Sequence, residues 1–297
     1  MDMTLLKNGL MRTASTVAFV VLGMGALSQQ AVAGIQDTKH NLSANSTATN
    51  KFSGTGEICV FCHTPHGSDT SASVPLWNRT MANPSTYTTY NSLGTSSLDG
   101  ATAPVGSVSL ACLSCHDGTQ AMSVLINEPG SGKVVSTFST DGAWTGSNQT
   151  GGAINNTLIT YIGTDLKNDH PVGIQYAGGP KSGNTIPTTE GATYNTFADA
   201  DFKAATTVVL NNQPVWYVNS NGTAGRQKTD IQLYTRTDAD KVTYAADGTR
   251  QVASKGIAGA QPFVECASCH DPHNSDNATF LRMANTNSAV CLACHTK

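Results

Sequence analysis

Alternating apolar and polar residues are concentrated between residues 206 and 253 of this 297-residue chain. The clearest run is TTVVLNNQPVWYVN, residues 206 to 219, in which an Asn-Asn-Gln-Pro break separates two β-like segments. Asn221-Gly222 and Asp247-Gly248 are dipeptides typical of hairpin turns. The pattern predicts a small β-meander with strands near residues 206–210, 215–219, 230–236 and 241–246. Two earlier runs, residues 133–140 and 156–162, are also β-like.

The longest apolar run lies near the start of the chain, from about Val17 to Leu27. Basic residues precede it and Ala31-Val32-Ala33 follows it, which is the pattern of a secretory signal peptide. The run is too short for a membrane span, and no cysteine at the cleavage site can take a lipid anchor. Residues 1–33 are therefore predicted to be removed, which leaves a soluble, exported chain.

Charged residues make up 12% of the chain, against about 25% in ordinary globular proteins, and Ser, Thr, Asn and Gly take their place. This composition predicts a mostly irregular, loop-rich fold. The formal net charge of −3 gives no electrostatic argument for binding nucleic acid.

All eight cysteines fall into four Cys-x-x-Cys-His motifs. This motif is the attachment signature of a c-type haem, in which two thiols bond the porphyrin edge and the imidazole binds iron. Structural zinc and disulfides are other uses of paired cysteines, but neither explains the histidine that adjoins every pair. The sequence therefore predicts four covalently bound haem c groups. Their thioether residues are Cys59, Cys62, Cys112, Cys115, Cys266, Cys269, Cys291 and Cys294.

The motifs form an internal repeat of a two-haem module. Residues 56–69 and 264–276 share the sequence C-x-x-C-H-x-P-H-[GN]-S-D, and each is followed by a second Cys-x-x-Cys-His site. Ser109 and Ser288 precede these second sites and could cap short helices, the first of which would end at Gly118. The predicted organisation is a signal peptide (1–33), an N-terminal dihaem module (34–118), a low-complexity, β-rich insert carrying His170 (119–261) and a C-terminal dihaem module (262–297).

The fold class that follows is a loop-rich multihaem cytochrome c. Short helices would carry the haem sites, the small β-meander would lie in the insert, and the haem macrocycles would form the core.

The chain has eight histidines, the number that four haems need if each iron binds two imidazoles. His63, His116, His270 and His295 are the proximal ligands by motif, and His40, His66, His170 and His273 remain as sixth ligands. An isolated histidine is ordinarily a surface residue, but here the count favours ligands. Methionine is the main alternative sixth ligand, with Met81, Met122 and Met283 as candidates.

His66 and His273 each lie three residues beyond their own motif's histidine. The two axial ligands of one iron approach from opposite faces of the haem, so each of these residues is expected to reach a different haem. Chain distances favour three pairs: His273 with His295, His40 with His63, and His170 with His116. His66 and the haem on His270 remain, to pair within one subunit or across a subunit boundary.

The doubled motif, the secretion signal and the Ser/Thr/Asn/Gly-rich chain resemble the extracellular multihaem cytochromes of metal-reducing bacteria, in particular the OmcE-type tetrahaem outer-surface cytochromes. The resemblance covers the haem modules and, within the insert, only Asp-His-Pro-Val-Gly around His170. It implies a homopolymeric filament that conducts electrons, in which a histidine of one subunit ligates a neighbour's haem. His66 is the first candidate for that role and His40 the second.

The function expected is electron transfer to extracellular acceptors, with other cytochromes as redox partners and no membrane span. Haems with two histidine ligands have no open coordination site, so no catalytic residues are expected. The alternatives are a monomeric periplasmic tetrahaem carrier and a haem-dependent reductase, which would need at least one five-coordinate iron.

Overall fold

The structure, a computed structural model, describes residues 34–94, 97–130, 144–169, 171–237, 240–244, 250–257 and 259–297. The predicted signal peptide, the β-like run at 133–140 and His170 lie outside these residues. Residues Gly34–Lys297 form one unit. None of the helices in the described part is long and apolar enough to cross a membrane.

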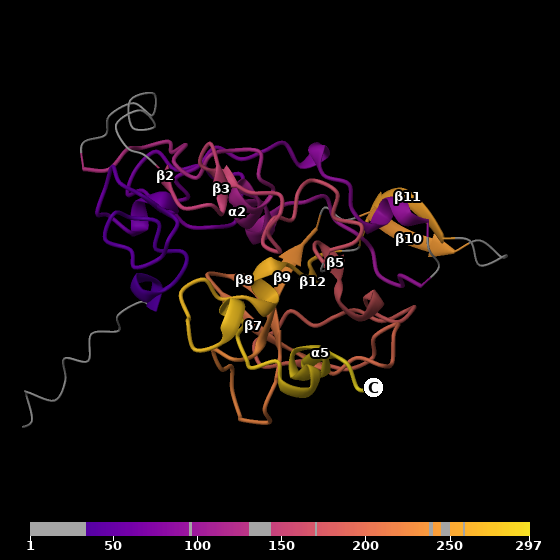
Figure 1. Cartoon of the computed structure of the whole chain (residues 1–297). Helices are drawn as coiled ribbons and strands as arrows, with labels where there is room; N and C mark the ends of the chain where they lie inside the picture. Colours follow the sequence, from indigo (N-terminus) through magenta and orange to yellow (C-terminus); the bar gives the residue numbers. More distant parts are fainter. Residues whose placement is uncertain are drawn as a thin grey trace, which may run out of the picture. The chain divides into compact units, whose positions relative to one another are not determined.

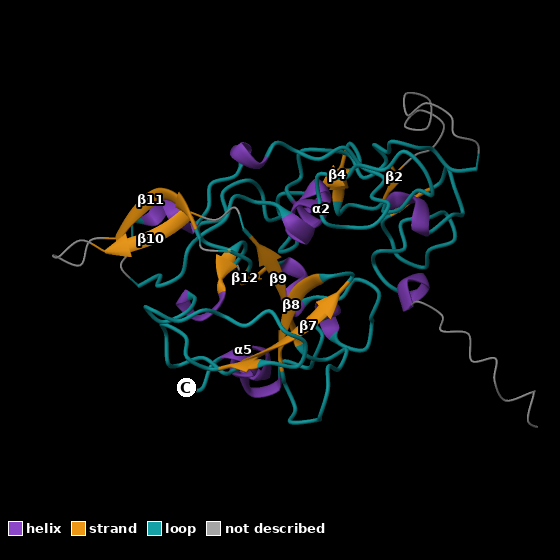
Figure 2. Cartoon of the chain, turned by 180° about the vertical axis from the view of Figure 1, so that it is seen from behind, coloured by secondary structure: helices purple, strands orange, loops and turns teal. Residues whose placement is uncertain are grey.

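The largest element is a six-stranded antiparallel sheet, whose longer strands Figures 1 and 2 show in orange and brown tones. Its strand order is β5-β12-β9-β8-β7-β6. The strands are β5 (Ile174–Gln175), β6 (Thr193–Tyr194), β7 (Ala205–Leu210), β8 (Gln213–Val218), β9 (Ile231–Arg236) and β12 (Gln261–Val264).

Three predicted strands are confirmed as β7, β8 and β9, which pair in sequence order. Asn211 and Asn212 join β7 to β8, and their φ angles of 49° and 63° suit a type I′ hairpin turn. The fourth predicted strand corresponds to β10 (Asp240–Tyr244), but it pairs with β11 (Arg250–Gly256) in a separate hairpin. The Asp247-Gly248 turn lies outside the described residues, and residues 156–162 form turns where a strand was predicted.

The predicted fold class, a loop-rich chain with haems as its core, was wrong, because the sheet builds an apolar core of its own. Trp216 and Ile231 are each 1% exposed and Val218 is 0% exposed, within a cluster that also includes Tyr176 and Leu233. Burial of this kind contributes about 25 cal/mol for each Å² of apolar surface. The prediction was based on the composition of the whole chain, which does not show that large apolar residues are concentrated in these strands.

The helices are short. The α-helices are α2 (Ser107–His116), α4 (Cys266–Cys269) and α5 (Ala289–Cys294). The 3₁₀ helices are η1 (Gly34–Asp37), η2 (Cys59–Phe61), η3 (Pro84–Thr86), η4 (Tyr90–Leu93), η5 (Tyr176–Gly178), η6 (Ala278–Phe280) and η7 (Thr286–Ser288). Two small strand pairs complete the description: β1 (Lys51–Phe52) with β2 (Trp144–Thr145), and β3 (Gln149–Thr150) with β4 (Ala153–Ile154).

Of the two serines expected as helix caps, Ser288 is at an N-cap position and Ser109 is not. Gly106 is the N-cap of α2, so Ser109 lies inside the helix, and Ser288 holds the N-cap position of α5 without a side-chain bond. Gly118 follows the C-terminal end of α2 with a φ of 69°, the left-handed conformation that favours glycine there.

Candidate haem-binding sites

Each Cys-x-x-Cys-His motif lies on a short helix or at its end. The four helices are η2, α2, α4 and α5, and the motif histidine is the last residue of α2 and the C-cap residue of α4 and α5. Thiols three residues apart on a helical turn lie on one face. The local structure therefore presents both thiols of each pair to one side, with the imidazole directly after them.

The internal repeat is visible in the backbone hydrogen bonds of residues 60–78 and 267–282. In both modules the chain turns back after His-x-Pro-His and passes the first motif again. The matching bonds are Thr64 N to Leu76 O (2.8 Å) and Asp271 N to Phe280 O (2.8 Å), and Asn78 N to Cys62 O (2.9 Å) and Arg282 N to Cys269 O (2.8 Å). Side chains follow the same repeat: Asn78 Nδ2 donates to Val60 O, and Arg282 Nε donates to the matching Ala267 O.

Three motif histidines are oriented by backbone carbonyls. Nδ1 of His63 lies 2.9 Å from Pro75 O, Nδ1 of His116 lies 2.8 Å from Thr160 O, and Nδ1 of His270 lies 2.8 Å from Thr279 O. A carbonyl oxygen only accepts, so Nδ1 carries the proton in each bond and Nε2 remains a base that can bind metal. The ring of His295 is held differently: it packs against Phe202 with centroids 4.1 Å apart.

Residues in the left-handed backbone conformation lie at or next to two of these carbonyls, those of Pro75 and Thr279. Leu76, directly after Pro75, has a φ of 57°, and Thr279 and Phe280 have φ values of 55° and 59°. This conformation costs a residue with a Cβ about 1–2 kcal/mol, so tertiary structure must hold it. Nothing in these residue types signals such a turn, and sequence reasoning missed it.

Two pairs of histidines have the spacing of axial ligands. The ring centroids of His63 and His273 are 6.2 Å apart with planes at 20°, and those of His40 and His116 are 6.1 Å apart with planes at 63°. Two metal–nitrogen bonds of about 2 Å, plus roughly 1 Å from each nitrogen to its ring centre, separate the centroids of two opposed imidazoles by about 6 Å. The spacing fits two imidazoles on opposite sides of one iron.

These pairs differ from the pairs that chain distances favoured. The structure brings His273 to His63, where His295 was expected, and His40 to His116, where His63 was expected. The number of residues between two histidines limits how far apart they can lie. Which histidines lie together depends on the direction that the chain takes after His-x-Pro-His, and the sequence does not show this direction. As predicted, His273 lies against the histidine of a motif other than its own.

His40 is held in its neutral form. Its ring stacks on Phe280, with centroids 4.3 Å apart. Burial, followed by the electrostatic effect of His116, His273 and His270, lowers the pKa of His40 to about 4. A neutral imidazole is the form that binds metal.

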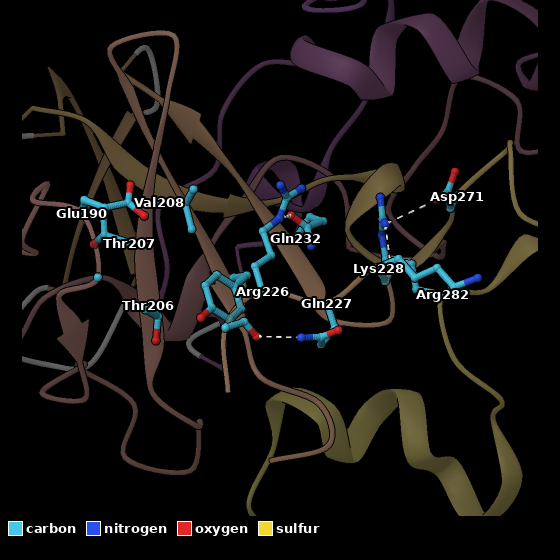
Figure 3. A pocket seen from close by; sticks show the side chains of 13 residues that line it. Glu190, Thr206, Thr207, Val208, Arg226, Gln227, Lys228, Gln232, Asp271 and Arg282 are labelled. Atoms are coloured by element: carbon cyan, nitrogen blue, oxygen red, sulfur yellow. Dashed lines mark hydrogen bonds and ion pairs between the residues drawn. The ribbon is translucent and has the colours of Figure 1, made fainter. Parts of the chain in front are cut away.

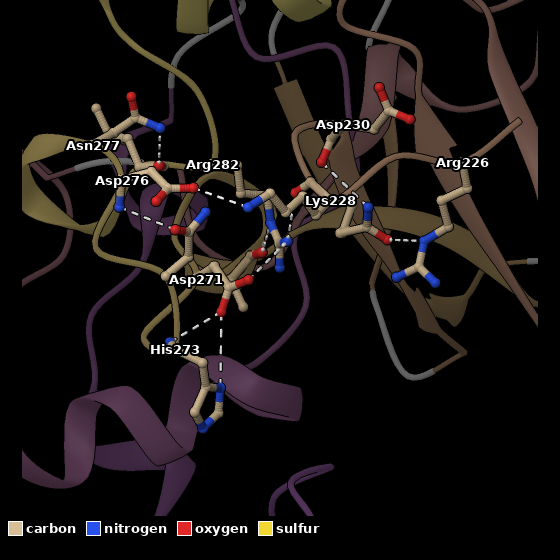
Figure 4. A network of polar contacts seen from close by, with 12 residues as sticks. Arg226, Lys228, Asp230, Asp271, His273, Asp276, Asn277 and Arg282 are labelled. Atoms are coloured by element: carbon tan, nitrogen blue, oxygen red, sulfur yellow. Dashed lines mark hydrogen bonds and ion pairs between the residues drawn. The ribbon is translucent and has the colours of Figure 1, made fainter. Parts of the chain in front are cut away.

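Asp271 orients His273, as Figure 4 shows. Nδ1 of His273 lies 3.8 Å from Asp271 Oδ1, and Arg282 Nη1 lies 3.7 Å from Asp271 Oδ2. A carboxylate beside one ring nitrogen leaves the other for a ligand. This arrangement suits His273 as a distal ligand.

His66 is exposed, although its backbone is well anchored. Its carbonyl accepts hydrogen bonds from Asn127 Nδ2 (2.7 Å) and Thr64 Oγ1 (3.1 Å), and Gly67 beyond it has a φ of 64°. The turn thus presents this imidazole to solvent.

Thiols of successive motifs interact. Cys112 and Cys266 share a hydrogen bond, Cys62 lies within electrostatic range of Cys115, and Cys269 within range of Cys291. Burial raises the pKa of the Cys62 thiol to about 12. The hydrogen bond from Cys112 lowers the pKa of Cys266 and raises that of Cys112. The four attachment sites therefore follow one another in space in their sequence order.

Elsewhere, a cleft of about 880 Å³ lies beside Asp271 and Arg282 (Figure 3). Its lining includes Arg226 and Lys228 as well as residues of β7, β8 and β9. Within the described ranges, no group of three or more His, Cys, Asp or Glu residues is placed to hold a metal ion directly.

Comparison with known proteins gives one family match. The family model described as the doubled CXXCH motif matches residues 261–297. No curated protein matches the chain significantly. Paired attachment motifs, helices that carry both thiols, and histidines oriented by carbonyls fit covalently bound haem c. The match and the sites together indicate a multihaem c-type cytochrome.

Proposed function

We propose that this chain carries electrons through four haem c groups, each with two histidine ligands. We further propose that it is the subunit of an extracellular filament of the OmcE type. The observation that carries the proposal is the spacing of 6.1 to 6.2 Å in two histidine pairs, each of which joins a motif histidine to a histidine from elsewhere in the chain. Attachment of c-type haem takes place outside the cytoplasm, which agrees with an exported protein.

In the two histidine pairs, the protein's own residues would occupy both ligand positions of the iron and leave no position for a substrate. Bonds from Nδ1 to the carbonyls of Pro75, Thr160 and Thr279 orient three motif histidines so that Nε2 would bind the metal. His273 and His40 would each supply the second imidazole of a haem held by His63 or His116. The haem supplies the one-electron couple, and such a site passes electrons without binding a substrate.

The contacts between successive motifs support a continuous path. Cys112 contacts Cys266, and the flanking pairs interact as well, so haem edges attached at these thiols are expected to lie near one another. Electrons would then move between the first and the fourth motif by way of the second and the third, in either direction.

His66 is the ligand that we propose is shared between subunits. His40 and His273 lie beside His116 and His63 within the chain, so we propose His66 and His170 as the second ligands of the other two haems. His66 and His170 are the histidines that remain, and His66 is the exposed one of known position. Donation of His66 to a neighbour's haem on His270 or His295 would join subunits and extend the haem path across the boundary.

The filament is tested with His66→Ala in the haem-loaded protein, examined by cryo-electron microscopy. Filaments should be lost while four haems per chain are retained, because covalent attachment does not need the sixth ligand. Asp276→Asn, a change at another exposed residue, is the matched control and should leave filaments intact. Intact filaments of His66→Ala would refute the shared ligand.

Two further outcomes decide between functions. A monomer at every concentration on sizing, with all haems low-spin, would favour a periplasmic carrier over the filament. A high-spin signal in the oxidised wild-type protein would show an open coordination site and favour a reductase.

A further inference from the structure

Arg79 is a completely buried cation between the first two haem motifs. Its side chain is 0% exposed. Nε donates to Ser114 Oγ (3.2 Å), Nη1 donates to Met122 O (2.8 Å), and Nη2 donates to Ser114 O (2.8 Å) and Ala121 O (3.1 Å). Every one of these acceptors is a neutral hydroxyl or carbonyl.

Buried arginines are usually balanced by a carboxylate. Arg236, the other arginine buried among the described residues, follows this rule, since its Nη1 lies 2.7 Å from Glu265 Oε1. The carbonyls that Arg79 contacts satisfy its donors, and the end of α2 contributes a partial negative charge. Neither carries a full negative charge, and no carboxylate among the described residues forms an ion pair with Arg79, so the guanidinium is a buried cation without a direct counter-charge.

The position of this charge links the two attachment sites of the N-terminal module. Arg79 directly follows Asn78, whose backbone N donates to Cys62 O of the first motif (2.9 Å). Its acceptor Ser114 lies between the two cysteines of the second motif. Arg79 also acts electrostatically on the Cys62 thiol, where it opposes the rise in pKa that burial causes. The guanidinium therefore lies close to where both haems of this module are attached.

The internal repeat supplies a matched position in the other module. Asn78 and Arg282 make equivalent bonds to their motifs, through the backbone to Cys62 and Cys269 and through the side chain to residues 60 and 267. The residue equivalent to Arg79 is therefore Met283, which is neutral and packs against the apolar core of the sheet. One module has a buried cation without a counter-charge at this position, whereas the other has a thioether, and the adjacent Arg282 is balanced by Asp271 at 3.7 Å.

We infer that Arg79 raises the reduction potentials of the haems on His63 and His116 above those of the haems on His270 and His295. A buried positive charge disfavours the ferric iron, which carries one more positive charge than the ferrous iron, and a low local dielectric strengthens the effect. Electrons within one chain then reside preferentially in the N-terminal module. The inference rests on the proposed haem content and ligation but not on the filament.

The test is a redox titration of the haem-loaded protein, with individual haems followed by NMR. Arg79→Met, which copies the residue of the second module, should shift the reduction equilibrium of the N-terminal haems by about tenfold toward the oxidised form, or about 59 mV for one electron. Arg79→Lys keeps the charge but loses most of the hydrogen bonds, and it should retain the wild-type potentials. Arg226→Met removes an exposed arginine and should change little.

The reciprocal variant Met283→Arg should raise the potentials of the C-terminal haems, and it decides the matter if Arg79→Met does not fold. The inference is overturned if Arg79→Met leaves the potentials unchanged or shifts all four equally. It is also overturned if Arg79→Lys lowers the potentials as much as Arg79→Met, or if Met283→Arg has no effect. A wild-type protein without four low-spin haem couples would instead refute the proposed function.

Discussion

At the scale of single residues, the angle between paired imidazoles gives two of the four proposed haems distinct signatures. The rings of His63 and His273 are close to parallel, at 20°, whereas those of His40 and His116 are at 63°. Near-parallel ligand planes give a rhombic low-spin signal in electron paramagnetic resonance, and strongly crossed planes give a highly anisotropic one. The two pairs can therefore be tested separately in one protein.

We expect His273→Ala to convert one haem of four to a high-spin form and to remove the rhombic signal, because the iron bound to His63 loses its sixth ligand. His40→Ala should remove an anisotropic signal instead. Asn274→Ala, a change beside His273, should leave the spectrum unaltered. If His273→Ala left the rhombic signal in place, His273 would ligate another haem and the pairing would be wrong.

The sequence indicates the residue types of the proposed sites more directly than it indicates which histidines lie together. The spacing of cysteine and histidine predicts the attachment residues and the motif ligands because the chemistry needs those residues next to one another. The pairing of His273 with His63 depends on a return turn through Leu76, whose φ of 57° no residue preference indicates. The number of residues between His40 and each motif does not indicate that His40 lies beside His116.

At the scale of elements, one buried polar cluster joins the second and third motifs. Glu265 is the N-cap of α4 and forms a capping box with Ser268. Its carboxylate accepts from Arg236 at the end of β9 and from Ser109 within α2, while Ser109 Oγ accepts from the backbone N of Cys266. This cluster therefore fixes α2, α4 and the sheet relative to one another.

Glu265→Gln is expected to destabilise the haem-loaded protein by about 3–5 kcal/mol, because it leaves the guanidinium of Arg236 buried without a counter-charge. The double variant Arg236→Met/Glu265→Gln should recover much of that loss. Both are measured as the free energy of unfolding in guanidinium chloride. Asp276→Asn breaks the exposed pair with Lys228 and serves as the control, with no measurable change expected. Losses that simply add in the double variant would contradict the coupling.

The alternation of apolar and polar residues predicted the long strands of the sheet correctly. It did not predict the short strands. The three strands predicted between residues 206 and 236 are β7, β8 and β9. Strands β5, with two residues, and β12, with four, carry too little pattern to be recognised, yet β12 connects the sheet directly to α4. The composition of the whole chain pointed to a haem core because it averages such segments with the polar loops.

At the scale of the whole molecule, residues of the two dihaem modules contact one another. His273 of the second module lies beside His63 of the first, and Glu265 accepts a hydrogen bond from Ser109. The thiols of Cys112 and Cys266 likewise meet across the modules. Folding therefore brings together cysteines that belong to different haems, which makes the order of haem attachment and folding important.

Without haem, the folded chain is expected to oxidise readily to a Cys112–Cys266 disulfide. The hydrogen bond from Cys112 lowers the pKa of Cys266, so its thiolate, the nucleophile in disulfide formation, appears at a lower pH than that of an ordinary thiol. Diamide, which takes up the two electrons and two protons released, should give this cross-link in apo protein, identified by non-reducing peptide mass spectrometry. Haem-loaded protein should give none, because both sulfurs are thioethers, and Cys112→Ser should abolish the cross-link. A cross-link between the cysteines of one motif in its place would show that the apo chain does not bring the modules together, and that haem attachment precedes and directs their contact.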